Sequence, residues 1–232
     1  LLGKQGLLLA SPSVSAKVLP GCGIDWSARS IPSEVFRGEC CEQELGRLSA
    51  AIAETHADVL VGLGGGKVID TAKIAADRAG IPVIIVPTIA SSDAPCSGCA
   101  VLYSQDGDFI SVLYQKSNPA AVLVDVEIIA AAPTRFLIAG MGDALSTWFE
   151  ARSCENTHSM NECGGYGTLA GFAIARLCYD TLLSDGVAAK IASQEHRITP
   201  ALQRIIEANI LLSGLGFESA GLAAAHAIHN GL

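Results

Sequence analysis

The sequence predicts an α/β protein whose N-terminal part is a Rossmann-like parallel-sheet domain with a β-hairpin insertion, followed by an all-helical C-terminal domain. Three observations predict this fold. Short apolar runs alternate with helical stretches as far as residue 132, and two strand-like runs flank a turn signal at Asp106-Gly107. From residue 133 onward only helical spacing is found, so we place a domain boundary between residues 132 and 133.

The first domain, residues 1–132, carries the alternation that is typical of βαβ units, which form parallel sheets covered by helices. The glycine after the second helix, Gly80, is a typical helix stop. The hairpin is predicted for CAVLYSQDGDFISVLY. Buried strands are predicted for GLLLAS, DVLVGLGGG, IPVIIVPT and AAVLVDVEII, and helices for CEQELGRLSAAIAETHA and KVIDTAKIAADRAG.

The second domain, residues 133–232, is predicted to be helical throughout. Thr199 before Pro200 fits a helix N-cap followed by proline at the first helical position. Asp143 follows two glycines and is predicted to lie at the start of a helix. The helical spacing covers residues 140–156, 164–183, 187–196 and 200–212.

Composition excludes several classes of protein. The 232 residues carry 15 basic and 23 acidic side chains, a net charge of −8, with no Lys/Arg cluster, which argues against a nucleic-acid surface. The sequence contains no run of about 18 uncharged apolar residues, so no membrane-spanning helix is predicted. The eight cysteines are irregularly placed, and no signal peptide is evident, so we expect reduced thiols and a cytoplasmic location.

The strongest local signal is the glycine turn in VGLGGGKVIDTAK, residues 61–73. A strand, three glycines and a helix start direct backbone N–H groups at one point, where the helix dipole favours a phosphate. The motif is neither a Walker A loop, because Val61 and Val68 replace the required residues, nor G-x-G-x-x-G, because Lys67 stands at the third glycine position. The alternative is a tight turn without a ligand.

The loop PTIASSDAPCSG, residues 87–98, follows a predicted buried strand, where parallel sheets bind ligands. It is either a ligand-binding loop or an ordinary polar surface loop. Cys96 and Cys99 form C-x-x-C, but no second pair suggests a structural zinc site, so we expect these thiols to pack. The loop's hydroxyls and carboxylate belong to Thr88, Ser91, Ser92, Ser97 and Asp93.

Near the end of the sequence, His226 and His229 lie on one face of a predicted helix. They are either metal ligands or surface residues, and Asp143 is likewise either a ligand or a helix cap. The remaining histidines lie in polar, helical surroundings and are predicted to be surface residues: His56, His158 and His196.

Several segments together resemble the glycerol dehydrogenases of the metal-dependent, iron-containing alcohol dehydrogenase family, which is related in fold to dehydroquinate synthase. The resemblance runs in order from about Gly38 to the end of the sequence, and more loosely from Gly3. The segments that carry it are GLGGGKVIDTAK, PTIASSDAPCS, GMGDALSTWFEA, TPALQRIIEAN and SGLGFESAGLAAAHAIHNGL.

This resemblance implies a set of site residues. Asp143 and His226 correspond to metal ligands, for Zn²⁺ with Fe²⁺ as a further possibility, and Asp93 corresponds to a substrate-binding carboxylate. All three are implied in catalysis and in substrate binding. The NAD-binding positions correspond to Gly64, Gly65, Gly66, Lys67, Val68, Thr88, Ile89, Ala90, Ser91, Ser97, Cys99 and Tyr103.

The implied reaction is NAD-dependent oxidation of glycerol, a small polyol, to dihydroxyacetone by hydride transfer from a zinc-bound alkoxide. The resemblance also implies a homo-oligomer for the full-length form. Three departures stand out. Val68 replaces a threonine of the family motif, and Ser11 stands where many relatives carry an aspartate near the adenosine ribose, which bears on the choice between NAD and NADP. The family's second histidine ligand lies beyond Leu232. We therefore expect a truncated helical domain, with cofactor binding retained and turnover poor or absent.

Two other functions stay open. A lyase of the dehydroquinate-synthase kind also uses NAD and a divalent metal, but it would need a basic pocket, and no Lys/Arg cluster lies near Asp143 or His226 in the sequence. The other alternative is a non-catalytic dinucleotide-binding fragment. Zinc stoichiometry measured beside NAD binding would separate that fragment from a dehydrogenase.

Overall fold

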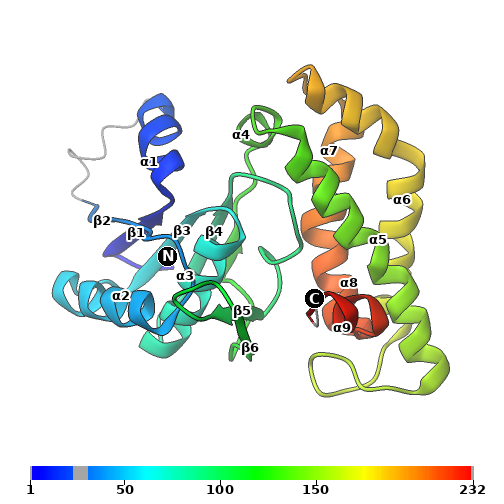
Figure 1. The fold of residues 1–232 in the computed structure, drawn as a ribbon, viewed down its shortest axis with the longest axis horizontal. Coiled ribbons are helices and arrows are strands. Elements are labelled where there is room, and N and C mark those ends of the chain that lie inside the picture. The colour runs from blue at the N-terminus through cyan, green and yellow to red at the C-terminus, as the bar shows by residue number, and fades with distance from the viewer. Residues whose placement is uncertain (1, 23–30, 231–232) are drawn as a thin grey trace. The chain divides into compact units, whose positions relative to one another are not determined.

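The computed structural model describes residues 2–22 and 31–230, without the side chains of Cys22, His229 and Asn230 (Figure 1). Its contacts divide the chain into two compact units. The sheet unit comprises Leu1–Thr88 and Gly98–Asp125, and the helical unit comprises Ile89–Ser97 and Val126–Leu232. The short segment Ile89–Ser97 therefore packs with the helices, although in sequence it follows a strand of the sheet.

The sheet unit is built on five parallel strands in the order β2-β1-β3-β4-β7, which confirms the predicted α/β architecture. Because β1 lies between β2 and β3, the chain changes its winding direction beside β1, where sheets of this kind bind ligands at the carboxyl ends of their strands. The strands are β1 (Gly6–Ala10), β2 (Ser33–Val35), β3 (Val59–Gly64), β4 (Val83–Pro87) and β7 (Ala121–Val122).

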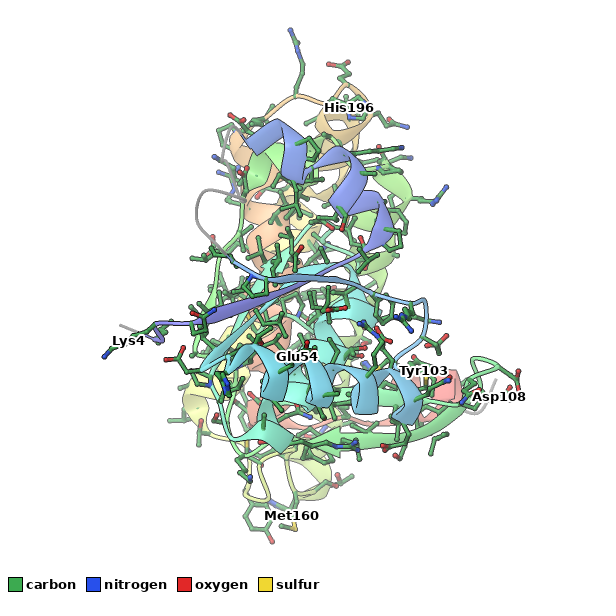
Figure 2. All side chains as sticks on the ribbon, turned by 90° about the vertical axis from the view of Figure 1, so that its left-hand side faces the viewer. Lys4, Glu54, Tyr103, Asp108, Met160 and His196 are labelled. Atoms are coloured by element: carbon green, nitrogen blue, oxygen red, sulfur yellow. The ribbon has the colours of Figure 1, made fainter. Side chains whose placement is uncertain are left out.

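Helices and a separate hairpin complete the sheet unit. The helix after β3 ends at Gly80, whose φ of 68° is left-handed, as the sequence predicts. The antiparallel hairpin is also confirmed, with Asp108 in its turn (Figure 2). These elements are α1 (Pro12–Lys17), the 3₁₀ helix η1 (Leu19–Cys22), α2 (Glu42–Thr55), α3 (Gly66–Ala79), β5 (Cys99–Tyr103) and β6 (Phe109–Tyr114).

Small residues let α3 lie directly on β3. A Cβ atom added to Gly62 would lie 2.7 Å from the Cβ of Ala72, a contact that real side chains do not make. Ala72 itself is fully buried. The abundance of alanine and glycine in the sequence therefore serves close packing of helix and strand.

A buried polar contact joins α3 to the hairpin. The Lys73 ammonium, only 1% exposed, donates to the carbonyl of Cys99, and Asp70 accepts from the Val101 amide at 3.2 Å. Burial raises the pKa of Asp70, opposed by the charge of Lys73 3.7 Å away. Because polar groups buried without partners are costly, these bonds hold the start of β5 on the helix.

The helical unit contains long antiparallel helices and several short ones (Figure 1). Thr199 caps α7 as predicted, accepting a hydrogen bond from the Leu202 amide at 3.2 Å. The helices are α4 (Val126–Ala130), α5 (Thr134–Thr157), α6 (Leu169–Gln194), α7 (Pro200–Glu207), the π-helix η2 (Ala208–Leu212), α8 (Ser213–Ala220) and α9 (Ala224–Asn230).

Two predicted elements of this part are wrong. The run AAVLVDVEII was predicted as a strand, but only Ala121–Val122 is a strand and Val126–Ala130 is a helix. A short apolar run fits either type of structure, so its periodicity misled the prediction. The helices predicted over 164–183 and 187–196 are one helix, α6, in which Gly186 is a packing residue: an added Cβ would lie 2.7 Å from Met141.

The predicted position of Asp143 at a helix start is also wrong. Helix α5 begins at Thr134, so Asp143 lies well inside it. The preceding Gly140 is a contact point, because an added Cβ would lie 2.1 Å from the carbonyl oxygen of Ala90 and 2.5 Å from Nδ2 of Asn209. The glycine that suggested a helix boundary instead admits the segment Ile89–Ser97 against the helix.

Asn209 also binds the segment Ile89–Ser97. Its fully buried side chain donates to the carbonyl oxygens of Ala90 at 3.0 Å and Leu137 at 3.1 Å. Asn209 lies in the π-helix η2, a distortion that often accompanies functional sites. Together Gly140 and Asn209 fix the backbone that leads to Asp93.

Seven described cysteines are free thiols, in agreement with the prediction of reduced cysteines. They lie in both units and range from buried to exposed, with Cys163 exposed.

Within residues 2–22 and 31–230, no helix is long and apolar enough to cross a membrane.

We expect the buried thiols to resist modification. Burial raises the pKa values of Cys40 and Cys178 to about 12, from an ordinary value of 9.0. Between pH 9 and pH 12 these thiols stay protonated in the folded chain but lose their protons in the unfolded chain. The free energy of unfolding should therefore fall as the pH rises from 9 to 12. At pH 9, iodoacetamide should modify Cys163 in the native chain but Cys40 and Cys178 only after urea is added, as read by peptide mass spectrometry. Fast native labelling of Cys178 would contradict its burial.

Candidate functional site

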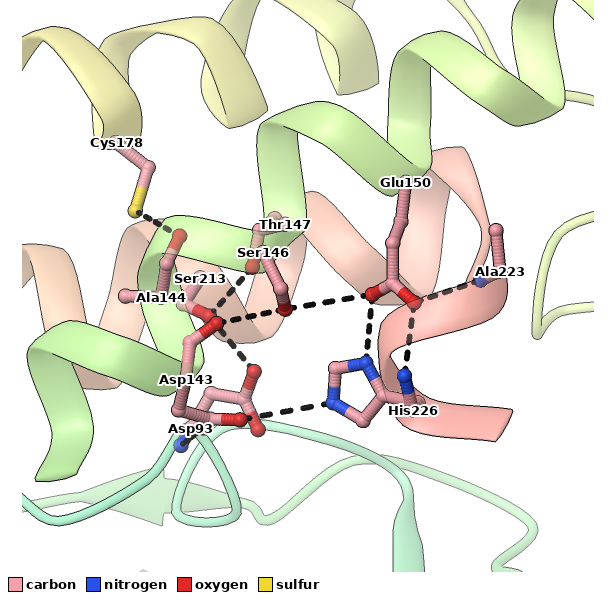
Figure 3. A network of polar contacts seen from close by, with 10 residues as sticks. All are labelled: Asp93, Asp143, Ala144, Ser146, Thr147, Glu150, Cys178, Ser213, Ala223 and His226. Carbon is pink, nitrogen blue, oxygen red and sulfur yellow. Dashed lines mark hydrogen bonds and ion pairs between the residues drawn. The ribbon is translucent and has the colours of Figure 1, made fainter. Parts of the chain in front are cut away.

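The candidate site is a polar network in the helical unit, formed by α5, α9 and the segment Ile89–Ser97 (Figure 3). At its centre, Asp143 Oδ1 lies 3.5 Å from His226 Nε2. Both side chains are partly accessible, each 24% exposed. The structure thus brings together the two residues that the resemblance implies as metal ligands.

The spacing of α5 explains one side of the network. Asp143 and Glu150 are seven residues apart, which places both side chains on the same face of the helix. Ser146 lies between them, and its hydroxyl lies 2.8 Å from the Asp143 carbonyl oxygen and 3.3 Å from the Glu150 carboxylate. One helix face therefore presents two carboxylates to α9.

Asp93 joins the network from the segment Ile89–Ser97. Its amide donates to Asp143 Oδ2 at 3.2 Å, and its carboxylate accepts from the Ser213 hydroxyl at 2.7 Å. Ser213 also lies 2.9 Å from the Thr147 hydroxyl, and both hydroxyl side chains are fully buried. Asp93 is only 8% exposed, so these bonds fix its orientation.

Beside Asp143 and His226 lies a cavity of about 420 Å³ within the helical unit. Its wall combines three serines, one aspartate and one histidine with small residues. A few polar groups in a mostly small-residue wall suit a compact polar ligand. The lining residues are Ser91, Ser92, Ala139, Gly142, Asp143, Ser146, Ala225 and His226.

The electrostatics of His226 follow from its two carboxylate neighbours. The hydrogen bonds to Asp143 and then to Glu150 raise the pKa of His226 to about 10, against the opposing effect of burial. Burial acts to raise the pKa of Glu150, but the hydrogen bonds from His226 leave it lowered. The negative potential that holds a proton on Nε2 equally favours a divalent cation there.

The donor atoms fit a shared metal ion. Two zinc ligands in a tetrahedral site lie about 3.4 Å apart, close to the 3.5 Å between Asp143 Oδ1 and His226 Nε2. His226 Nδ1 lies 2.6 Å from Glu150 Oε2, the contact that usually orients a metal-ligating histidine. In the described ranges no group of three or more His, Cys, Asp or Glu side chains could hold a metal ion, so Asp143 and His226 could supply two ligands at most.

Sequence reasoning missed Glu150. The carboxylate is buried, 3% exposed, and contacts His226 directly. Its position seven residues after Asp143, on the same helix face, is the signal that could have revealed it.

The predicted phosphate-binding turn lies at the carboxyl end of strand β3, in the sheet unit. Gly64 ends β3, Gly65 is the N-cap of α3 and Gly66 is its first residue. The first amides of a helix lack intrahelical partners and are available to an anion. Val68 is different, because its amide donates to the Gly65 carbonyl at 3.1 Å and its buried side chain packs beneath Gly64.

Lys67 extends from this turn and carries the local positive charge. Its ammonium is ion-paired with Glu39 and lies 5.2 Å from the centre of the Tyr103 ring. The lysine side chain is 49% exposed. Burial raises the pKa of Tyr103, with Asp70 as the next cause, so its hydroxyl stays protonated and able to donate.

The other predicted cofactor positions divide between the two units. Thr88 and Cys99 belong to the sheet unit, where the Thr88 amide donates to the Gly64 carbonyl at 3.0 Å and ties this residue to the glycine turn. Ser91 lines the cavity described above, and Ala90 and Ser97 are buried. The positions in the helical unit are Ile89, Ala90, Ser91 and Ser97.

The remaining histidines are exposed, as predicted. His56, His158 and His196 each follow the end of a helix with a φ of 52°. His196, labelled in Figure 2, follows α6. Its Nδ1 lies 2.8 Å from the Ala130 carbonyl oxygen. The side chain of His229, predicted to share a helix face with His226, lies outside the described residues.

Comparisons with known proteins agree with this arrangement. Glycerol dehydrogenase of Thermotoga maritima is 57% identical over 202 residues, which are 87% of this chain and 55% of that protein. Glycolaldehyde reductase of Halobacterium salinarum is 44% identical over 238 residues, covering 100% of this chain and 64% of that protein. The crystal structure of a probable glycerol dehydrogenase from Sinorhizobium meliloti gives a TM-score of 0.93 at 50% identity, covering 99% of this chain and 63% of that chain.

The chain spans about half the length of the curated glycerol dehydrogenases that it matches. The model of the iron-containing alcohol dehydrogenase family matches residues 3–133, more than half of the 232 residues. The strand order, the glycine turn and the paired Asp143 and His226 accompany this match. The chain therefore belongs to the iron-containing alcohol dehydrogenase family.

Proposed function

We propose that the protein is an NAD-dependent polyol dehydrogenase that oxidises glycerol to dihydroxyacetone with a divalent metal, zinc or iron. The observation that carries the proposal is the 3.5 Å approach of Asp143 Oδ1 and His226 Nε2 beside a small polar-walled cavity. The relatives named glycerol dehydrogenase support glycerol as the substrate. Assembly into a homo-oligomer stays a prediction from the resemblance.

In this proposal Asp143 and His226 hold the metal. A catalytic zinc site takes three protein ligands and one open position, so the third ligand comes from outside the described residues. When bound, the metal stabilises negative charge on the substrate oxygen and NAD accepts a hydride from the substrate carbon. Both Fe²⁺ and Zn²⁺ accept a carboxylate and an imidazole as ligands.

The residues of the chain orient the substrate. The Ser91 and Ser92 hydroxyls in the cavity wall are suited to a polyol, which carries a hydroxyl on each carbon. Asp93 follows these serines in the sequence, its carboxylate is fixed by Ser213, and it is the position that the resemblance assigns to substrate. Fixing the hydroxyls in this way lowers the entropic cost of reaching the reactive geometry.

The residues of the sheet unit are proposed to hold NAD. The amides of Gly65, Gly66 and Lys67 at the start of α3 suit the pyrophosphate, and the Lys67 ammonium adds charge. Val68 contributes packing under Gly64 and is left out of the proposed contacts.

Binding and turnover test the proposal separately. Calorimetric titrations of the purified chain should show one NAD site and one zinc site, and a chelator should abolish only the zinc site. In the purified chain, whose turnover we expect to be poor or absent, any glycerol-dependent formation of NADH should require zinc and return when zinc is restored. A chain that binds NAD but neither binds zinc nor oxidises glycerol would instead be a dinucleotide-binding module, and glycerol oxidation that survives chelation would contradict the metal's role.

Replacing Lys67 by methionine should weaken NAD binding roughly 10-fold, because one charge-assisted contact to phosphate contributes about 1.5 kcal/mol or more. The zinc dissociation constant should not change. Lys190, an exposed lysine on α6, provides the matched control, and Lys190→Met should leave both constants unaltered. Equal NAD affinity in Lys67→Met and the unmodified chain would remove Lys67 from the cofactor site.

A further inference from the structure

Glu150 is a buried carboxylate that makes four hydrogen-bond contacts at the base of the candidate site (Figure 3). Oε1 accepts from the amides of Ala223 and His226, each at 3.0 Å. Oε2 lies 2.6 Å from His226 Nδ1 and 3.3 Å from the Ser146 hydroxyl. One oxygen thus holds the backbone around the start of α9, and the other holds the imidazole ring.

This division gives the two carboxylate oxygens different chemical tasks. A histidine that binds a metal through Nε2 must carry its ring proton on Nδ1. Only a hydrogen-bond acceptor at Nδ1 stabilises that tautomer, and Glu150 Oε2 is such an acceptor. The Nε2 atom then faces Asp143 Oδ1, 3.5 Å away.

We infer that Glu150 is a positioning residue for the metal site: it fixes the tautomer and the ring orientation of His226 and thereby raises the metal affinity. The inference rests on the proposed metal-dependent function and deepens it. Glu150 acts through His226 and is not itself a ligand. Asp143 and Glu150 project from the same face of α5, so one helix holds both carboxylates in fixed positions relative to His226.

Glutamine at this position isolates the ring contact. Its amide oxygen can replace Oε1 and keep both backbone bonds, while its NH₂ group replaces Oε2 and donates toward His226 Nδ1. The opposite orientation would point NH₂ at two amide donors, a worse arrangement. In Glu150→Gln, Nδ1 therefore becomes an acceptor and the ring proton moves to Nε2, where it blocks the metal.

The test compares the unmodified chain with Glu150→Gln and with Glu155→Gln, an exposed glutamate on the same helix. The zinc dissociation constant, measured by competition with a chromophoric chelator, should rise about 10- to 100-fold in Glu150→Gln and stay unchanged in Glu155→Gln. With zinc present, proton NMR should show the Nδ1–H signal of His226 in the unmodified chain and Glu155→Gln. Hydrogen exchange of the His226 amide should remain slow in all three.

Other outcomes overturn the inference. An unchanged zinc constant in Glu150→Gln would show that the ring contact does not support metal binding. Loss of zinc affinity together with fast exchange of the His226 amide would show that Glu150 only anchors α9. Absence of zinc binding in the unmodified chain would overturn the proposed metal site itself, a result distinguishable from failure of Glu150 alone.

Discussion

Replacing Gly140 by alanine is expected to lower the free energy of unfolding by roughly 3 kcal/mol, at the upper end of the cost of overpacking. The added Cβ would lie 2.1 Å from the Ala90 carbonyl oxygen and 2.5 Å from Nδ2 of Asn209. Neither neighbour can withdraw easily, because the buried Asn209 amide also bonds Ala90 and Leu137. Urea-induced unfolding, followed by circular dichroism, measures the change.

The same helix offers a control of opposite sign. Gly142 is exposed, and an added Cβ there meets nothing within 4 Å. Gly142→Ala should therefore stabilise the protein by about 0.5–1 kcal/mol, the usual gain when alanine replaces glycine inside a helix. Equal effects of the two substitutions would contradict the close approach of the segment Ile89–Ser97 to α5.

Replacing Asp143 by asparagine should weaken zinc binding by more than about 100-fold, because it removes one of two ligands and one negative charge. The amide can still accept from the Asp93 amide through its oxygen, and it then turns an NH₂ group toward His226. Zinc affinity should fall, together with any glycerol oxidation that the unmodified chain shows. A chromophoric chelator and an assay for NADH formation provide the two measurements.

Asp180 on α6 supplies the control, because its ion pair with Arg176 is exposed and contributes little. Asp180→Asn should retain the zinc constant of the unmodified chain. If Asp143→Asn also retained it, Asp143 would not be a ligand, and the proposed metal site would have to lie elsewhere.

Much of the fold could be predicted because its signals are local. The strand from Gly6, the helix that ends at Gly80 and the cap at Thr199 follow from apolar periodicity and from glycine, proline and threonine chemistry. The hairpin around Asp106-Gly107 follows from its turn residues. In such cases the residues nearby decide the structure.

The prediction was wrong at glycines that pack against residues distant in the sequence. The sequence predicted a helix start after Gly140 and a break between residues 183 and 187, yet Gly140 and Gly186 both lie inside long helices, in close contact with Ala90 and Met141. No local pattern distinguishes a glycine that ends a helix from one that admits a neighbour. The contact partner has to be known.

The candidate site shows the same limit. Asp143 and His226 were identified by resemblance, and the structure places them side by side. Glu150 was not predicted as a site residue, because a single glutamate in a helix is ordinarily a surface residue. Its importance depends on α9 returning over α5, a tertiary event that periodicity does not encode.

The packing of Ile89–Ser97 with the helices has a consequence for dissecting this protein by gene truncation. Residues 119 positions apart, Ala90 and Asn209, are joined by a buried hydrogen bond, and Asp93 and Ser213 are joined across 120 positions. A recombinant fragment starting at Val126 would encode every helix from α4 to α9 but lack their nine-residue insert. Such a fragment should express as an incompletely ordered bundle, and adding Ile89–Ser97 as a synthetic peptide should restore its order.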